Sequence, residues 1–165
     1  MKSIALVGFM GSGKSSVGKK LTDYLNIPFY DTDEVVENQL GMQIKDIFKR
    51  HGEDYFREVE EEVLLSMPSD GAVIATGGGI VESPVNRETL KNNFNSIWLQ
   101  ASFPTISKRL EADAKRPLWN NNDQLKHELF RSRQNLYQQS TVKIIKVDEL
   151  EIDECAQEIL CYLNL

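Results

Sequence analysis

The sequence predicts an α/β fold in which a parallel sheet is covered by helices on both faces. Short apolar runs of strand length recur along the 165 residues. Segments with helical spacing of apolar residues separate these runs. Strands that alternate with helices favour parallel pairing, because each crossover helix returns the chain to the same end of the sheet. A chain of this length suits one domain, so we expect a single domain over residues 1–165.

Five apolar runs are the candidate strands: Ile4–Val7, Pro28–Tyr30, Val73–Ala75, Ile97–Leu99 and Val142–Val147. Between them, apolar residues recur at helical spacing, as at Val17, Leu21 and Leu25. A sheet of this kind binds its ligands at the carboxyl ends of the strands. The residues that directly follow each run are therefore the first place to look for a site.

Two stretches interrupt the alternation. About 40 residues between the second and third runs look helical, although a crossover needs only about a dozen. We therefore expect inserted material there. The second stretch, Glu111–Asp123, is polar and a poor helix. It is either a solvated loop or a lid that excludes water during a phosphoryl transfer.

Composition indicates a globular protein, with 27% charged and 41% hydrophobic residues. The net charge of −6 argues against a nucleic-acid or anionic-membrane surface, since both would favour a basic face. No apolar run is long enough to span a membrane, and we expect a cytoplasmic protein. Cys155 and Cys161 are expected to be reduced, half-buried residues of a helix. They form no zinc pattern with His51 or His127.

The loop Gly8–Ser16 reads GFMGSGKSS and matches the pattern G-x-x-x-x-G-K-[ST]. A strand precedes it and an amphipathic helix follows it, which is the context that a phosphate-binding loop requires. Glycines let successive backbone N–H groups approach phosphate oxygens, and the helix N-terminus adds a favourable dipole. The loop therefore predicts a nucleotide site, with a plain turn as the alternative.

Within this loop, Lys14 would reach the β- and γ-phosphates and Ser15 would place its hydroxyl on Mg²⁺. We expect ATP as co-substrate, Mg²⁺ as cofactor, and nucleotide contacts from Gly11, Ser12, Gly13, Lys14, Ser15 and Ser16. The ordered motifs of GTPases are missing from the sequence. The third strand ends in Thr76-Gly77-Gly78-Gly79 instead of the acidic pair of motor ATPases. Small-molecule kinases remain.

The second strand runs out at Asp31-Thr32-Asp33. Two carboxylates two residues apart on an extended segment share one face. One can approach Mg²⁺ while the other faces the acceptor hydroxyl, and we assign Asp31 to the metal and Asp33 to the acceptor. Thr32 or Asp33 could also cap a helix that begins near Glu34, and capping is compatible with catalysis.

Further candidate site residues follow the third strand and lie on the helical segments. The glycines Gly77–Gly79 either present backbone N–H groups to a ligand or form a flexible turn. A net-acidic protein needs placed cations to hold anionic ligands, and Arg57, Arg116 and Arg133 are candidates. Each arginine alone would more commonly be a solvated surface charge. Glu60 lies one helical turn after Arg57 and could hold it in place.

In order and spacing, these residues together resemble the shikimate kinase family. The matches are Gly8–Ser16, Asp31-Thr32-Asp33, Ile47-Phe48, Gly52-Glu53, Phe56-Arg57, Gly77-Gly78-Gly79, Arg116-Pro117-Leu118, and Arg133 ahead of Leu136-Tyr137. The resemblance implies a P-loop fold like that of nucleoside-monophosphate kinases. Its five-stranded parallel sheet would carry a substrate-binding insertion at about 32–62 and a lid at about 111–123.

The resemblance also implies an activity, which is transfer of the ATP γ-phosphoryl group to the 3-hydroxyl of shikimate in aromatic amino acid biosynthesis. It implies small-molecule substrates, with no nucleic-acid or membrane partner, and we expect a monomer. Alternatives are another small-metabolite kinase such as a gluconate kinase, a nucleoside monophosphate kinase, or a degenerate nucleotide-binding module.

By the same resemblance, Asp33 would accept the hydrogen bond of the attacking hydroxyl, and Arg57 and Arg133 would bind the shikimate carboxylate. Other substrate contacts would come from Phe48 and Phe56 as walls and from the backbone of Gly78 and Gly79. On the nucleotide side, Arg116 would descend with the lid onto the phosphates and join Lys14 and Asp33 in catalysis. Arg109 would stack on adenine.

Three departures from the common family pattern are visible. Trp119 follows Arg116-Pro117-Leu118 where an aliphatic residue is usual. Ser132 precedes Arg133 where an acid is usual. The segment 138–141 replaces a more acidic stretch.

Overall fold

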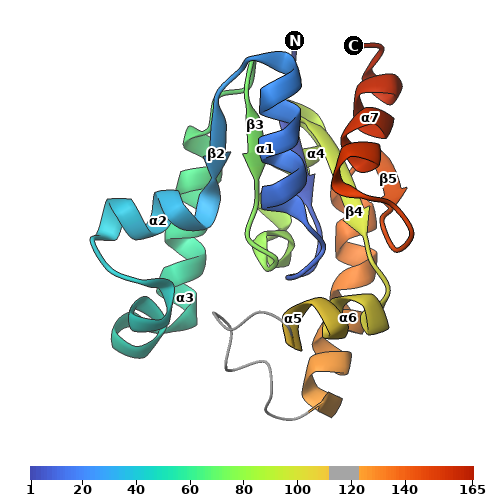
Figure 1. Ribbon diagram of the computed structural model, residues 1–165. Helices are drawn as coiled ribbons and strands as arrows, with labels where there is room; N and C mark the ends of the chain where they lie inside the picture. The colour runs from blue at the N-terminus through green and yellow to red at the C-terminus, as the bar shows by residue number, and fades with distance from the viewer. Residues whose placement is uncertain (112–122) are drawn as a thin grey trace.

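The computed structural model describes residues 1–111 and 123–165 and shows one five-stranded parallel sheet in the order β2-β3-β1-β4-β5 (Figure 1). The strands are β1 (Ile4–Val7), β2 (Phe29–Asp31), β3 (Val73–Ala75), β4 (Asn95–Gln100) and β5 (Lys143–Lys146). Within the described residues, all four strand pairings of this sheet are parallel. The predicted fold class is confirmed.

The central strand β1 lies between β3 and β4, with Leu6 opposite Ala75 on one side and Ile97 on the other. All four residues of β1 are buried, as are the three of β3. Continuous apolar runs of this kind are typical of strands covered on both faces. Because the strands are all parallel, their carboxyl ends lie at the same edge of the sheet, opposite the two chain termini (Figure 1).

Helices cover both faces of the sheet, as predicted. α1 and α7 pack together on one face, and α4 and α6 pack together on the other (Figure 1). The helical elements are α1 (Lys14–Leu25), α2 (Thr32–Leu40), α3 (Ile44–Ser66), the 3₁₀ turn η1 (Ile80–Glu82), α4 (Pro84–Asn93), α5 (Phe103–Glu111), α6 (Asp123–Ser140) and α7 (Ile152–Leu163).

The expected insertion between the second and third strands is helical and consists of α2 and α3. These helices have a small apolar core of their own, formed by Val36, Ile47, Phe56, Val59 and Val63. α3 bends at Gly52, where φ is 84°. This left-handed conformation suits glycine because a side chain would strain it. The helix axis therefore changes direction at Gly52, between the two halves of α3.

Some expectations are corrected or lie outside the described residues. Cys155 is buried and Cys161 is exposed, so the two free thiols of α7 are not both half-buried. Across 1–111 and 123–165, no helix could cross a membrane and no cluster of three metal-ligating side chains occurs. Of the expected lid at about 111–123, the structure describes only the two end residues. Arg116 and Trp119 lie outside the described part.

Candidate active site

The loop between β1 and α1 has a backbone that only its glycines adopt readily. Gly11 and Gly13 have φ values of 79° and 97°, in the left-handed region. Lys14 begins α1 and is buried. Its Nζ donates hydrogen bonds to the carbonyl oxygens of Gly8 and Phe9, at 2.8 and 3.0 Å. These hydrogen bonds stabilise the loop conformation and place the positive charge of Lys14 inside the loop.

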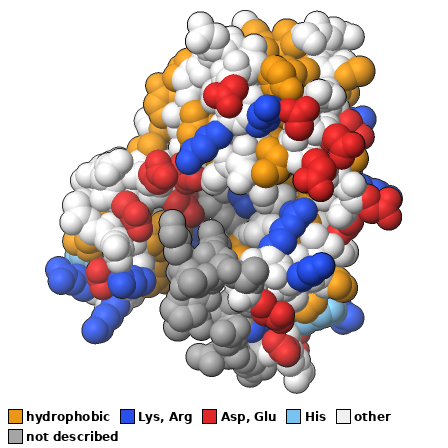
Figure 2. Space-filling model, viewed as in Figure 1, with side chains coloured by type: hydrophobic (Ala, Val, Ile, Leu, Met, Phe, Trp, Pro, Cys, Tyr) orange, Lys and Arg blue, Asp and Glu red, His pale blue; other side chains and the backbone are white. Residues whose placement is uncertain are grey.

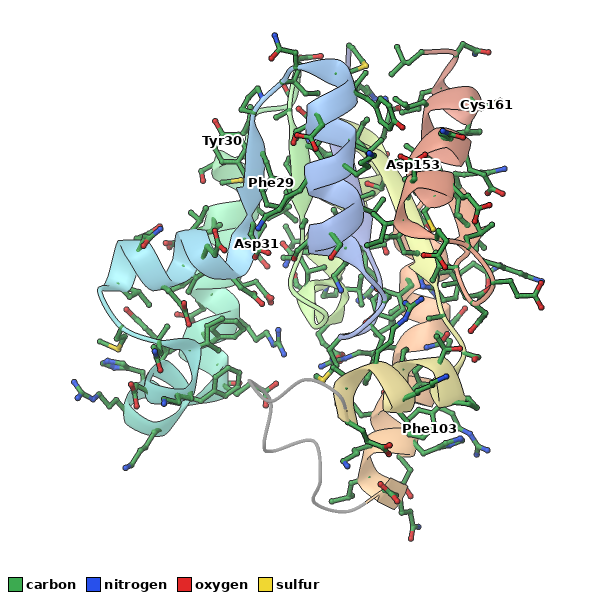
Figure 3. The ribbon with its side chains drawn as sticks, viewed as in Figure 1. Phe29, Tyr30, Asp31, Phe103, Asp153 and Cys161 are labelled. Carbon is green, nitrogen blue, oxygen red and sulfur yellow. The ribbon has the colours of Figure 1, made fainter. Side chains whose placement is uncertain are left out.

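Ser15 and Asp31 meet at the edge of this loop. Ser15 Oγ donates to Asp31 Oδ2 at 2.9 Å, and Asp31 Oδ1 accepts from the N–H of Asp33 at 3.1 Å. Asp31 ends β2 and is the N-cap of α2 (Figure 3). The expectation that Thr32 or Asp33 caps this helix is therefore wrong. The helix begins at Thr32, so the two aspartates do not share an extended segment: the first caps the helix and the second lies in its first turn.

Thr32 connects the carboxyl ends of two strands. It is fully buried, and its hydroxyl accepts a hydrogen bond from the N–H of Gly77 at 3.0 Å. A cleft of about 460 Å³ opens beside this connection, and Figure 2 shows a hollow on this side of the molecule. Lys14, Ser15, Asp31 and Asp33 all line the cleft together with the start of the glycine loop. The phosphate-loop lysine and both aspartates therefore share one space.

The glycine loop Gly77–Gly79 lies between three charged side chains that come from different helices. A β-carbon on its first residue would lie 2.5 Å from Asp33 Oδ1, and one on its second would lie 3.8 Å from Arg133 Nη1. A β-carbon on its third residue would collide with the guanidinium group of Arg57. The structure thus brings Asp33 of α2, Arg57 of α3 and Arg133 of α6 together at three consecutive glycines. Side chains on the first and third would displace them.

Arg57 is held by two carboxylates of its own helix. Its Nη1 donates to Glu60 at 2.7 Å and its Nη2 to Glu53 at 3.3 Å. The predicted pairing with Glu60 is confirmed, and the Glu60 side chain is only 2% exposed. Burial raises the pKa of Glu60, against the opposing effect of Arg57. Burial tends to lower the pKa of Arg57, but Glu60 and Glu53 outweigh it and raise that pKa. The guanidinium therefore stays charged.

Arg133 has a partner that sequence reasoning did not find. Its Nε donates to Glu82 Oε1 at 2.7 Å, across 51 residues of chain. Its guanidinium lies over the ring of Phe9 at 5.8 Å. Tyr137, one turn further along α6, donates its hydroxyl hydrogen to the carbonyl of Gly78 at 2.6 Å. Burial raises the pKa of this phenol, so it remains a donor. No local signal pairs Glu82 with Arg133, because they meet only when η1 packs against α6.

Phe48 and Phe56 lie on α3, on opposite sides of its bend at Gly52. Their ring centroids are 4.8 Å apart. Phe56 is buried in the core of the insertion, whereas Phe48 is partly exposed at its margin. The pair lies next to Arg57, whose guanidinium lies over the Phe56 ring at 5.2 Å.

A second cavity, of about 420 Å³, adjoins the phosphate loop on its other side. Ser12, Gly13 and Ser16 line it, together with Arg109 of α5. Arg109 donates to the carbonyl oxygens of Gly11 and Val147, at 3.2 and 3.4 Å. The predicted nucleotide residues within the described part of the chain thus line one or both of the two cavities, and Gly13 and Ser16 line both.

The opposite wall of this second cavity is the segment Val147–Ile152, which follows β5. Sequence reasoning did not single it out, although it follows the fifth strand and the strand-end rule pointed there. Burial tends to raise the pKa of Asp148 in this segment, but hydrogen bonds from Thr105 and Ser102 lower it overall. The carboxylate is thereby kept ionised at the rim.

Ser15 and Asp31 offer the hard oxygen ligands that Mg²⁺ prefers. The described residues contain no cluster of three or more acidic, histidine or cysteine ligands. Such a sparse protein set fits Mg²⁺, which commonly keeps several waters and binds substrate phosphates besides one or two protein oxygens.

Comparisons with known proteins agree with this geometry. The family model described as "Shikimate kinase" matches residues 10–164. A shikimate kinase of Sulfurihydrogenibium sp. is 41% identical over 161 residues, which cover 97% of this chain and 96% of that protein. The solved shikimate kinase of Acinetobacter baumannii, in complex with shikimate, is 34% identical, with a TM-score of 0.92 over 99% of this chain and 93% of that one. The Aquifex aeolicus shikimate kinase structure is 36% identical, with a TM-score of 0.86 over 98% and 96%.

Proposed function

The chain belongs to the shikimate kinase family, and we infer that it transfers the γ-phosphoryl group of ATP to the 3-hydroxyl of shikimate, a step of aromatic amino acid biosynthesis. The observation that carries this conclusion is the convergence of Asp33, Arg57 and Arg133 on the glycine loop, next to the cleft that contains Lys14. One acid beside two arginines suits a substrate that combines a reacting hydroxyl with a carboxylate. The Acinetobacter relative has been solved with shikimate bound.

On the nucleotide side, we propose that the loop Gly11–Ser16 holds the phosphates through its backbone N–H groups and the N-terminus of α1. Lys14 would turn from the loop carbonyls toward the β- and γ-phosphates and offset the charge that develops there. Arg109 would stack on adenine in the second cavity, which is bounded by Val147–Ile152. Arg116 remains a proposed phosphate ligand from outside the described residues.

On the acceptor side, we propose that Arg57 and Arg133 bind the shikimate carboxylate through paired charged hydrogen bonds. The backbone of Gly78 and Gly79 would contact the ring substituents, because neither residue has a side chain to keep a ligand away from its N–H group. Phe48 and Phe56 would form a wall of this part of the site. We thus propose that the segment at about 32–62 is the substrate-binding insertion and that the segment at about 111–123 is the lid. Both would belong to a single domain over residues 1–165.

The reaction forms a bond between the substrate hydroxyl oxygen and the γ-phosphorus and breaks the bond from that phosphorus to the bridging oxygen, which leaves with ADP. Asp33 would orient the hydroxyl by accepting its hydrogen bond and take up its proton late, because the transition state is loose. Its carboxylate is suitably placed, since it lines the same cleft as Lys14.

The chemistry that Mg²⁺ would supply when bound is positive charge that offsets the charge of the phosphates. In this chain, Ser15 and Asp31 are the residues proposed to hold it. Their present hydrogen bond of 2.9 Å already keeps both oxygens on the cleft side of the loop.

The direct test is a coupled ADP-release assay with ATP·Mg²⁺ and, in separate reactions, shikimate, gluconate or AMP. We expect ADP release with shikimate and only background release with the other two. Equal or greater turnover with gluconate or AMP would overturn the assignment, and identification of shikimate 3-phosphate by mass spectrometry would exclude uncoupled ATP hydrolysis.

A further inference from the structure

We propose that Glu82 is a positioning residue for shikimate binding: it fixes the guanidinium of Arg133 so that its terminal nitrogens face the substrate. This inference rests on the proposed function, because it takes Arg133 to bind the shikimate carboxylate. It adds a residue from η1, outside the motifs that identified the family.

The first argument is the geometry of the pair. Glu82 Oε1 accepts from Arg133 Nε at 2.7 Å, and Nη1 lies on the other side, beside the glycine loop. An arginine that donates its Nε to one carboxylate keeps both terminal nitrogens for another planar anion. Glu82 therefore binds the Nε–H of the guanidinium and leaves the two terminal nitrogens available to a substrate carboxylate.

The second argument concerns burial. The Arg133 side chain is 8% exposed, whereas that of Glu82 is 38% exposed. A buried guanidinium without a carboxylate would carry an uncompensated charge, so the pair stabilises the arginine in place. The partial exposure of Glu82 leaves its own charge screened by water, which weakens its repulsion of an anionic substrate.

The third argument is that the surrounding contacts restrict Arg133 in the other directions. The ring of Phe9 lies under its guanidinium, and Tyr137 ties the same helix to the carbonyl of Gly78. Arg57 has an equivalent partner in Glu60. Each of the two arginines proposed to bind the carboxylate is thus oriented by its own glutamate, from the same helix in one case and from η1 in the other.

The experiment compares Glu82→Ala and Glu82→Gln with the unaltered protein in steady-state kinetics and in direct binding of shikimate and ATP. We expect Glu82→Ala to raise KM and Kd for shikimate about tenfold, as suits loss of one hydrogen bond to a charged group. Glu82→Gln keeps an acceptor oxygen and should recover part of the loss. The KM for ATP should stay within about twofold, since no ATP contact is altered.

Glu88→Ala is the matched control, because this exposed glutamate of α4 has the same charge and lies outside the site. It should leave both KM values unchanged. Unchanged ATP binding and a melting transition that stays cooperative exclude misfolding of the Glu82 variants, even where loss of the ion pair lowers the melting temperature.

Arg133→Ala separates this inference from the proposed function. If Arg133→Ala leaves shikimate binding intact, the proposed role of the arginine itself fails. If Arg133→Ala weakens shikimate binding but Glu82→Ala leaves it unchanged or tightens it, only the positioning role is refuted. When both weaken binding, Glu82→Ala should add little in the Arg133→Ala background, and additive losses would contradict action through the arginine.

Discussion

Replacement of Gly79 by alanine tests the geometry of the site with one carbon atom. Gly79 has φ of −94° and ψ of 2°, which alanine can adopt, so the backbone tolerates the change. The added β-carbon would collide with the guanidinium of Arg57. That guanidinium is fixed at 2.7 Å from Glu60 and cannot withdraw without breaking the ion pair. The substitution should therefore displace Arg57 and leave the fold intact.

The size of the effect follows from the contact that is disturbed. Truncation of one partner in a buried charged contact costs about 2–5 kcal/mol, and a displaced arginine that keeps part of its contact should lose roughly half of that. At 1.4 kcal/mol for each factor of ten, KM for shikimate should rise by about five- to sixtyfold. Stability should fall, because displacing Arg57 weakens its ion pair with the buried Glu60, and this loss outweighs the small gain from reduced freedom of the unfolded chain.

The assay is coupled ADP release with shikimate varied at saturating ATP, together with a thermal melting curve. Glu88→Ala is the control, because this exposed residue of α4 lies outside the site. A shikimate KM for Gly79→Ala within twofold of the unaltered protein would refute the reasoning. So would an equal loss in Glu88→Ala.

Three further outcomes are expected. Lys14→Ala should lower kcat by at least about a hundredfold, because it removes the charge that faces the γ-phosphate; near-normal turnover would contradict the loop assignment. Ser15→Ala should raise the Mg²⁺ concentration needed for half-maximal rate by about tenfold, since Asp31 alone would remain as the protein ligand; an unchanged metal dependence would argue against this site. Because burial raises the pKa of Glu60, the free energy of unfolding should fall as pH rises from its ordinary value of 4.5 through the folded pKa. Glu60→Gln should lack that fall in denaturant titrations, and an identical pH profile would show that Glu60 contributes none of it.

Much of the fold could be read from the chain because parallel strands buried on both faces are continuous apolar runs. The predicted ranges for the first and third strands agree with β1 and β3 in full. The fourth strand extends beyond its apolar centre to Asn95 and Gln100, whose polar side chains hid the ends. The cap of α2 was misassigned because three neighbouring residues, Asp31, Thr32 and Asp33, all have capping side chains. The extended backbone of Asp31, with helical residues from Thr32 onward, identifies Asp31 as the N-cap.

The candidate site divides in the same way. The phosphate loop, its lysine and the Arg57–Glu60 pair could be predicted, because each is a local pattern of loop or helix spacing. The cavity wall Val147–Ile152 follows the fifth strand, where such a sheet binds ligands, but it was not singled out because nothing in its composition distinguishes it from an ordinary loop.

By itself, the sequence determined the elements, the class of the sheet and the chemistry of the contiguous loop Gly8–Ser16. Only the tertiary structure decided which side chains meet at the glycine loop: Thr32 bonds Gly77, Tyr137 bonds Gly78, and Glu82 bonds Arg133. The physical reason is that local conformation depends on near neighbours in the chain. These hydrogen bonds join residues 45, 59 and 51 positions apart, and their short range lets them form only after sheet order and helix packing have brought the partners together.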